Sequence, residues 1–390
     1  MIQDRGPLTG IKVLELGHIV AGPATTLILA ELGADVIKLE RPGAGDQARA
    51  SKVNQGHFVS YNSNKKSVEL DLSTPDGRGA VLALAAQSDI LVDNFAPNTL
   101  DRLGLGPDVL RANNPGLIHC SLKGFLPGPY GDRPLTDEPA QMMGGLAFMT
   151  GPSGQPLRSG TSIVDISAGM FGVIAILAAL HERSRTGLGR LVHVGLFESV
   201  VLMVGQHIAN TTLTGIPPVP MPERGMGQAL GWGIYRIFAT ADGRSVFVAV
   251  LSDAHWQRFC EVFDLDDLWN DPSLSSNMGR AEQHERLGKR TAEIMAQLDY
   301  ATAVKLLAEA KLPFAPVNTP ADLVEDEHLR AVGMLHQVTA PDGRKALIAG
   351  LPLTTSGWFE GARANPPVLG ADTADVLALA RKFMSTKVDS

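Results

Sequence analysis

Short apolar runs rich in valine, isoleucine and leucine recur along the first half of the chain, separated by stretches of helical character. Runs of this length and composition predict buried β-strands. The first two runs flank residues 24–32, which read as a helix that ends at Gly33. A strand, a helix and a second strand within about thirty residues form a βαβ unit, so we expect an α/β fold with a parallel sheet. The predicted strands are residues 11–16, 34–40, 89–95, 117–122 and 190–196.

A polar or basic residue stands at the carboxyl end of several of these runs. Because the carboxyl ends of parallel strands meet at one edge of a sheet, we expect these side chains to line a single crevice suited to a large anion. The turn after the first strand carries Gly17 and Gly22 instead of a GxGxxG spacing, which argues against a dinucleotide site. Arg41 is open to a second interpretation, as a solvated surface charge. The residues at the strand ends are His18, Arg41, Asn94 and Lys123.

One carboxylate, Asp165, precedes the most apolar helical stretch of the chain. Residues 169–180 carry no charge and read as a buried helix, with Gly187 as its stop signal. The apolar stretch is too short to predict a membrane span. Ser162, three residues before Asp165, fits a helix start, so Asp165 either caps this helix or is a partly desolvated nucleophile beside its N-terminus.

Other charged and aromatic residues have simpler interpretations. Lys65 and Lys66 read as a solvated turn before a small strand at 68–72. Trp256 reads as a packing residue, whereas a substrate contact stays open for Trp232 because it adjoins a glycine-rich loop. Five histidines have no partner at a useful spacing and are interpreted as structural or surface groups: His57, His119, His181, His193 and His255.

The second half of the chain predicts a smaller domain. Proline and glycine cluster at residues 212–222 and mark a boundary. Beyond it, residues 234–240 and 245–251 flank a turn and predict a hairpin, and residues 254–312 read as helical. We expect a large domain over residues 1–224, a small α+β domain over 225–325 and a C-terminal segment, 326–390, that returns to the large domain.

Composition narrows the classes of function. The chain has 390 residues and a formal net charge of −7, which argues against bulk binding of nucleic acid. Its two cysteines, Cys120 and Cys260, are not spaced as metal ligands, so we expect core thiols in a reducing compartment. Residues 1–6 do not resemble a signal peptide, and we expect a soluble cytoplasmic protein with no metal site.

The order of several short motifs resembles that of the family III CoA-transferases, of the CaiB/BaiF type, a group that includes formyl-CoA transferase. The resemblance extends from the first strand to the last helix. No single motif is decisive, but the set is specific. The motifs are residues 7–14, 18–23, 32–40, 64–67, 93–95, 100–104, 123–125, 165–169 and 367–370.

This resemblance implies a fold, an assembly and a ligand. The family fold is a large Rossmann-like domain built from both chain ends, together with a smaller domain. Two chains interlock, so the resemblance implies a homodimer. Coenzyme A is a substrate that lies along the strand ends of the large domain, and no permanently bound cofactor is expected.

The resemblance also implies roles for individual residues. Asp165 aligns with the catalytic aspartate of the family. A covering loop of the small domain would fall on Gly225, Gly227 and Gln228, and Phe125 replaces a tyrosine of formyl-CoA transferase. The residues expected to contact CoA are His18, Ile19, Arg41, Asn94, Phe95, Arg102, Lys123 and Phe125.

The implied chemistry is the transfer of CoA from an acyl-CoA to a carboxylic acid. Asp165 would form first an anhydride with the acyl group and then a thioester with CoA. Backbone N–H groups near the helix start or in the glycine loop would stabilise the oxyanion. The acyl group is not readable, although a dicarboxylate donor such as succinyl-CoA is one hypothesis. Arg158 or Arg224 would then meet the distal carboxylate, unless both are surface charges.

Three alternatives remain open at this stage. An α-methylacyl-CoA racemase shares the family fold, but Thr136 stands before Asp137 where the racemase pattern has a histidine, and Asp137 then reads as a helix cap. A non-catalytic acyl-CoA-binding protein would not need Asp165. A nicotinamide dehydrogenase is disfavoured because the GxGxxG spacing is absent.

Overall fold

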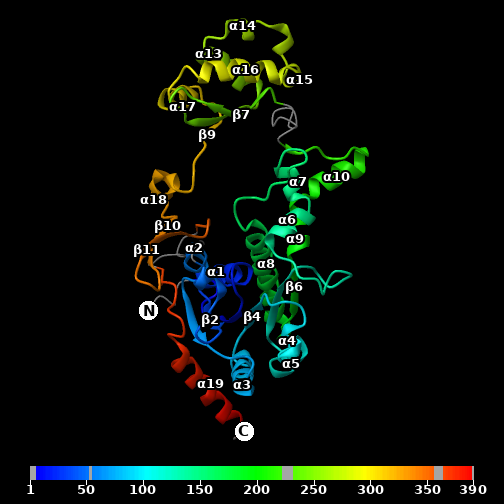
Figure 1. Cartoon of the computed structure of the whole chain (residues 1–390), viewed down its shortest axis with the longest axis vertical. Helices are drawn as coiled ribbons and strands as arrows, with labels where there is room; N and C mark the ends of the chain where they lie inside the picture. The colour runs from blue at the N-terminus through cyan, green and yellow to red at the C-terminus, as the bar shows by residue number, and fades with distance from the viewer. Residues whose placement is uncertain (1–5, 52–54, 222–231, 355–362, 389–390) are drawn as a thin grey trace. The chain divides into compact units, whose positions relative to one another are not determined.

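The computed structural model describes residues 6–51, 55–221, 232–354 and 363–388. The chain divides into two compact units (Figure 1). The first contains residues 1–146, 159–208 and 326–390, and the second contains residues 147–158 and 209–325. Helices α7 (Leu146–Thr150) and α10 (Gly205–Thr214) each run across a boundary between them.

The first unit is built on a six-stranded sheet in the order β3-β2-β1-β4-β5-β6. Every neighbouring pair of strands is parallel, which confirms the predicted parallel sheet. From β1 the strands are added on one side as β2 and β3 and then on the other side as β4, β5 and β6. In α/β folds, ligands bind outside the carboxyl ends of the strands at such a switch point, here between β1 and β4. The strands are β1 (Lys12–Leu16), β2 (Asp35–Glu40), β3 (Lys65–Glu69), β4 (Ile90–Asp93), β5 (Ile118–Lys123) and β6 (Leu191–Gly195).

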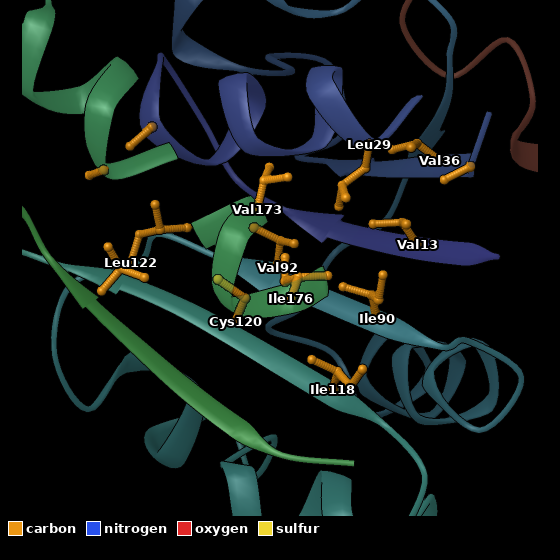
Figure 2. Close-up of a cluster of buried hydrophobic side chains, with 14 of the residues drawn as sticks. Val13, Leu29, Val36, Ile90, Val92, Ile118, Cys120, Leu122, Val173 and Ile176 are labelled. Carbon is orange, nitrogen blue, oxygen red and sulfur yellow. The ribbon is translucent and has the colours of Figure 1, made fainter. Parts of the chain in front are cut away.

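Successive side chains of β5 lie on opposite faces of the sheet, one of which is covered by α8. Ile118, Cys120 and Leu122 are buried in one hydrophobic cluster together with Val173 and Ile176 of α8 (Ile163–Thr186) (Figure 2). Successive side chains of a strand point to opposite faces, so the intervening residues of β5, among them His119 and Lys123, face away from α8.

Helices cover both faces of the sheet. Helix α1 (Ala21–Glu31) contributes Leu29 to the cluster shared with α8 (Figure 2). On the opposite face, Val376 of α19 (Thr373–Val388) joins leucines of α3 (Pro75–Ala85), and α19 lies beside α3 (Figure 1). The remaining helices of this unit are η1 (Gln47–Ala50), α2 (Gln55–Tyr61), α4 (Thr99–Arg102), α5 (Pro107–Asn113), α6 (Asp137–Met143), α9 (Leu196–Met203) and α18 (Glu327–Ala331).

Glycines bring α1 and α8 into close contact. A Cβ atom on Gly169 would lie 3.3 Å from the carbonyl oxygen of Ala21, and one on Gly172 would lie 3.4 Å from the side chain of Thr25. The Thr25 hydroxyl donates to the Gly169 carbonyl at 3.4 Å. Since Asp165 stands about one helical turn before Gly169, it is held at the same end of the sheet as the start of α1.

The second unit has its own core around an antiparallel sheet, β7-β8-β9. The predicted hairpin is present as β7 (Ile234–Ala239) and β8 (Ser245–Val250), with β9 (Phe314–Pro316) added to β8. Trp256 is 2% exposed, as expected for a packing residue. The other helices are α13 (Asp253–Val262), α14 (Asp266–Trp269), η2 (Pro272–Leu274), α15 (Asn277–Glu282), α16 (His284–Met295), α17 (Tyr300–Glu309) and η3 (Asp322–Glu325).

The C-terminal segment contributes a second hairpin, β10 (Leu335–Thr339) and β11 (Lys345–Ala349), which pair antiparallel. Val338 and Ile348 of this hairpin bury with Val59 of α2. Segments far apart in the sequence therefore complete the first unit.

The lysine pair was predicted wrongly. Lys65 and Lys66 are the first two residues of β3, which begins three residues earlier than expected. Lys65 is 6% exposed and forms an ion pair with Glu15 at 2.8 Å. Lys66 faces outward and pairs with Asp35 at the surface. Lys65 rather than Lys66 is buried because Glu15, fifty residues earlier in the chain, pairs with it inside the protein. The local sequence around the two lysines does not contain this information.

Helix α8 is longer than the predicted apolar stretch. It has 24 residues and ends at Gly187, whose φ of 70° fits the predicted stop signal. By length and composition it is the one helix in the described part of the chain that could cross a membrane, which corrects the expectation that the stretch is too short. Part of its surface lies in the core, whereas Met170 and Ile174 are exposed.

Candidate active site

The turn between β1 and α1 lies at the point where the strand order reverses. The backbone N–H of His18 donates to the Asn94 side-chain oxygen, and the Asn94 amide donates to the His18 carbonyl, both at 2.9 Å. A Cβ atom on Gly22 would lie 2.9 Å from the Cα of Gly17, so the turn is tight enough to require glycine at both positions. These contacts join the ends of β1 and β4 at the predicted crevice.

A buried group of charges supports this turn from below. Lys38 is fully buried and lies 2.7 Å from Glu15 Oε1 and 2.8 Å from Asp46 Oδ2. The other oxygen of Asp46 accepts from the backbone N–H of Ile19, whose φ of 65° is unusual for a β-branched residue. Burial opposes ionisation of Lys38, but the two carboxylates outweigh it and raise the pKa of Lys38. The ion pairs therefore hold the strained backbone at Ile19.

Lys65 completes the group. Its ammonium donates to Glu15 Oε2 at 2.8 Å, to the Pro23 carbonyl at 3.0 Å and to Asn62 at 3.1 Å. Burial lowers the pKa of Lys65 to about 8, even though Glu15 favours the charged form. Two lysines and two carboxylates thus balance one another under the turn.

Asp137 is the residue that caps α8. Its Oδ2 accepts from the backbone N–H groups of Val164 and Asp165, at 2.8 and 3.1 Å. Gln141 donates to the other oxygen at 2.6 Å. The expected cap from Ser162 is absent, since its side chain makes no capping hydrogen bond. The prediction that Asp137 caps a helix is correct in kind, but the helix begins 26 residues later.

Asp165 is consequently free of the capping role, and its carboxyl group is partly desolvated. Burial raises the pKa of Asp165, and the nearby Asp137 carboxylate raises it further, to about 7. Both influences favour the protonated acid, so an ionised Asp165 is an unusually basic carboxylate. A strongly raised pKa is typical of functional carboxylates.

Tyr61, at the end of α2, shares this environment and was not singled out from the sequence. Burial raises the pKa of its phenol, and the Asp165 carboxylate raises it further, which places the two groups within electrostatic reach. No local signal marks Tyr61, because helix α2 and Asp165 are about a hundred residues apart and meet only in the fold.

The end of β4 carries a second polar cluster. Asp93 is fully buried, accepts from Lys123, and lies 2.8 Å from His119 Nε2. Lys123 also donates to the Phe95 carbonyl at 2.8 Å. The interpretation of His119 as a histidine without a partner is therefore wrong. Its partner, Asp93, lies on the neighbouring strand, beyond the reach of spacing along one strand.

The predicted CoA contacts are distributed around the same strand ends. The rings of His18 and Phe95 lie 5.9 Å apart, between centroids. Arg41 and Arg102 are exposed, with Arg102 donating to Thr99 at 2.9 Å, and Phe125 is buried at 3% exposure. The predicted covering loop at Gly225, Gly227 and Gln228 lies outside the described residues, as does Arg224.

The arrangement places a basic carboxylate, Asp165, at the start of α8. Within residues 6–51, 55–221, 232–354 and 363–388, no three His, Cys, Asp or Glu side chains gather so as to hold a metal ion. The start of α8 offers a basic carboxylate, and the β1–α1 turn beside it offers backbone and an imidazole. Such a site suits covalent catalysis by a carboxylate.

Comparisons with known proteins agree on one family. A sequence profile of CoA-transferase family III matches residues 8–373. The chain is 33% identical to succinyl-CoA:mesaconate CoA-transferase of Haloarcula hispanica, over 95% of this chain and 96% of that protein. It is 31% identical to mouse succinyl-CoA:glutarate CoA-transferase, over 95% and 86%, and 30% identical to formyl-CoA:oxalate CoA-transferase of Rhodopseudomonas palustris, over 98% and 95%.

A solved structure carries the same relationship. The crystal structure of a CaiB/BaiF family protein from Brucella suis superposes with a TM-score of 0.85 at 31% identity, covering 97% of this chain and all of that one. The chain therefore belongs to CoA-transferase family III and is a CoA-transferase.

Proposed function

We propose that this CoA-transferase works through covalent intermediates on Asp165. The observation that carries the proposal is the raised pKa of Asp165 at the start of α8, about 7, at the carboxyl edge of the sheet. A carboxylate is a weak nucleophile in water. Partial desolvation beside a second carboxylate makes the ionised form more basic and therefore more reactive.

The first half of the reaction opens the donor. The Asp165 carboxylate attacks the thioester carbonyl of the acyl-CoA, and the carbon–sulfur bond breaks. The products of this step are free CoA thiolate and an anhydride between Asp165 and the acyl group. The thiolate then attacks the aspartyl carbonyl, the donor acid leaves as its carboxylate, and an aspartyl-CoA thioester remains. The anhydride conserves the activation of the thioester.

The second half repeats these steps in reverse with the acceptor. Its carboxylate attacks the aspartyl thioester, which releases CoA thiolate and forms a second anhydride. The thiolate then attacks the acceptor carbonyl, so the new acyl-CoA leaves and the Asp165 carboxylate is restored. Water would hydrolyse either anhydride. We propose that the predicted covering loop at Gly225–Gly231 protects them by excluding water.

The donors for the oxyanion follow from the geometry of α8. The backbone N–H groups of Val164 and Asp165 already bond to Asp137, and that of Ile166 bonds to the Ser162 carbonyl. The backbone N–H groups at the start of the helix are therefore already used in hydrogen bonds. Of the two sources of oxyanion donors expected from the sequence, we propose the glycine loop.

We propose a dicarboxylic acid as one substrate. The names of the three relatives each include a dicarboxylic acid, mesaconate, glutarate or oxalate, and the CoA donor is succinyl-CoA in two of them and formyl-CoA in the third. Succinyl-CoA is therefore the first donor to test. His18, Ile19, Asn94 and Phe95 are proposed to border the pantetheine arm, and Arg41 and Arg102, both exposed, to meet the phosphates.

We also propose that the chain forms the interlocked homodimer of its family. Helix α8 leaves Met170, Ile174 and Leu177 exposed at 48%, 61% and 38%. A row of large exposed apolar side chains on a helix that is buried only in part favours cover by a second chain. Light scattering after size exclusion should give twice the mass of the chain, and a monomeric mass at micromolar concentration would contradict the assembly.

Trapping the intermediates tests the reaction. We expect succinyl-CoA followed by hydroxylamine or borohydride to modify Asp165, as mapped by peptide mass spectrometry. Asp165→Ala should abolish the adduct and lower transfer by at least ~10³-fold. An unmodified Asp165 with every acyl-CoA tried, together with solvent deuterium at the substrate α-carbon, would replace the proposal by the racemase reaction.

A further inference from the structure

Side chains from three separate segments hold the backbone of the β1–α1 turn. Lys38 of β2 donates at 2.8 Å to the carbonyl of the residue before His18. Asn94, just after β4, bonds to both the N–H and the carbonyl of His18. Asp46, in the loop after β2, accepts from the N–H of Ile19 at 3.0 Å. The two successive peptide groups on either side of His18 are therefore bonded at both their oxygen and their nitrogen.

Asp46 uses both oxygens of its carboxylate inside the protein. Its Oδ1 accepts from the N–H of Ile19 and, at 2.9 Å, from the N–H of Ala48, which makes Asp46 the cap of η1. Its Oδ2 lies 2.8 Å from Lys38 Nζ. Asp46 is only 4% exposed, and although burial opposes its ionisation, Lys38 and the two N–H donors outweigh burial and lower the pKa of Asp46. An ionised carboxylate is a stronger acceptor for a backbone N–H than a neutral group.

Ile19 is held in a conformation that its own side chain disfavours. Its φ of 65° lies in the left-handed region, where a β-branched residue is strained. Glycine would adopt this φ without that strain. Ile19 is nevertheless 37% exposed, so the isoleucine is not needed to fill the core. A strained, exposed apolar residue at the edge of the sheet where α/β folds bind ligands indicates that its side chain serves the function.

The turn leads directly into the contact between α1 and α8. Ala21, two residues after Ile19, is the first residue of α1, and a Cβ atom on Gly169 would lie 3.3 Å from its carbonyl oxygen. Gly169 stands about one helical turn after Asp165, so the turn and this carboxylate lie at the same end of the helix pair. A shift of the turn backbone would therefore change where its side chains lie relative to Asp165.

We propose that Asp46 is a positioning residue for CoA transfer. It holds Ile19 in the left-handed conformation, so that the Ile19 side chain and the His18 ring face the thioester as it approaches Asp165. Asp46 does not itself touch the substrate, because its carboxylate is buried and bonded within the protein. This inference rests on the proposed function, in which His18 and Ile19 border the pantetheine arm.

The first test compares Asp46→Ala with Asp271→Ala. Asp271 also caps a 3₁₀ helix, η2, accepts from the N–H of Ser273 at 2.9 Å and pairs with Arg286, but it belongs to the second unit. The probes are succinyl-CoA as donor and mesaconate, glutarate and oxalate as acceptors. Asp46→Ala should lower kcat at least ~10-fold, whereas Asp271→Ala should leave it within about twofold. Titration calorimetry with CoA counts the chains that bind, and kcat is expressed per binding chain, so loss of folded protein does not imitate loss of positioning.

Ile19→Gly tests whether Asp46 acts through Ile19. Glycine adopts the left-handed conformation without an anchor and has no side chain to position. In the Ile19→Gly background, Asp46→Ala should therefore lower kcat by less than about twofold. Asp46→Asn, which keeps an oxygen acceptor for the Ile19 N–H, should lose less activity than Asp46→Ala and takes its place in this cycle if Asp46→Ala does not fold. An equal loss in the two backgrounds, or a kcat of Asp46→Ala equal to that of the wild type, would overturn the proposal.

The Ile19 methyl group provides a readout that needs no turnover. In methyl NMR spectra of the isoleucine-labelled chain, the signal that Ile19→Gly removes should shift when free CoA is added. In Asp46→Ala the same signal should have moved before CoA is added and should respond less to it. A wild-type signal that does not respond to saturating CoA would also contradict the proposal. Asp165→Ala should keep the response, so failure of the covalent steps is distinguished from failure of this inference.

Discussion

Two groups of buried charge lie at the same edge of the sheet and are built in opposite ways. Under the β1–α1 turn, Lys38 and Lys65 are matched by Glu15 and Asp46 at contact distances of 2.7 to 2.8 Å. At the start of α8, Asp165 has another carboxylate, Asp137, as its charged neighbour. The first group is neutralised within itself, whereas the second keeps an unmatched charge.

The difference separates stability from reactivity. Matched charges stabilise a conformation, here the backbone of Gly17 to Ile19. An unmatched pair costs stability, and in return one of its members can gain or lose a proton near pH 7. A protein retains such a cost at a site where the chemistry needs it.

The largest effect should follow from breaking the matched group. Lys38→Met leaves Glu15 and Asp46 buried with one remaining lysine, so we expect the free energy of unfolding to fall by ~3–5 kcal/mol. Urea unfolding measures this. Lys66→Met is the matched control, because Lys66 pairs with Asp35 at the surface and should cost less than ~1 kcal/mol. Equal effects of the two substitutions would show that burial of the first group is unimportant.

Removing the charge of Asp165 should raise the free energy of unfolding, whereas Lys38→Met should lower it. The carboxyl of Asp165 ionises near pH 7 in the folded chain, and near pH 3.9 when unfolded. Between these values the folded state holds a proton that the unfolded state has released, so stability falls as the pH rises from about 4 to about 7 and stays lowered above it. Asp165→Asn should therefore stabilise the chain by ~2–4 kcal/mol at pH 8.

The same variant should gain clearly less at pH 5 and should be inactive in CoA transfer. Unfolding curves at the two pH values provide the comparison. Asp108→Asn, which makes the same chemical change at an exposed acid on α5, is the control. A gain for Asp165→Asn that is independent of pH would mean that its pKa is not raised.

The smallest effect should come from neutralising one member of the pair while keeping an oxygen that caps α8. Asp137→Asn retains an oxygen to accept from Val164 and Asp165 but removes the like charge. We expect the acidic limb of the pH dependence of kcat/KM, near pH 7 in the wild type, to move to lower pH. An unmoved limb would assign the raised pKa to burial alone.

Much of the fold follows from local pattern. The apolar runs and the helix between the first two predict the parallel sheet, and the Ala241-Asp242-Gly243 turn predicts the β7–β8 hairpin. Asp165 could be selected because its motif resembles that of a known family, whereas a carboxylate before an apolar helix is by itself a common helix cap. Tyr61 could not be selected, since nothing near it in the sequence points to Asp165.

Sequence by itself determined which segments form strands and helices and that α8 ends at Gly187, because backbone preference and apolar periodicity act over a few residues. The order of short motifs along the chain also indicated the family. Tertiary structure alone decided that Lys65 is buried while Lys66 is not, that Asp137 rather than Ser162 caps α8, and that His119 meets Asp93. Each of these outcomes depends on a partner from a distant segment. The energy of a buried charge or hydrogen bond is set by that partner and by the exclusion of water, and neither exists before the chain folds.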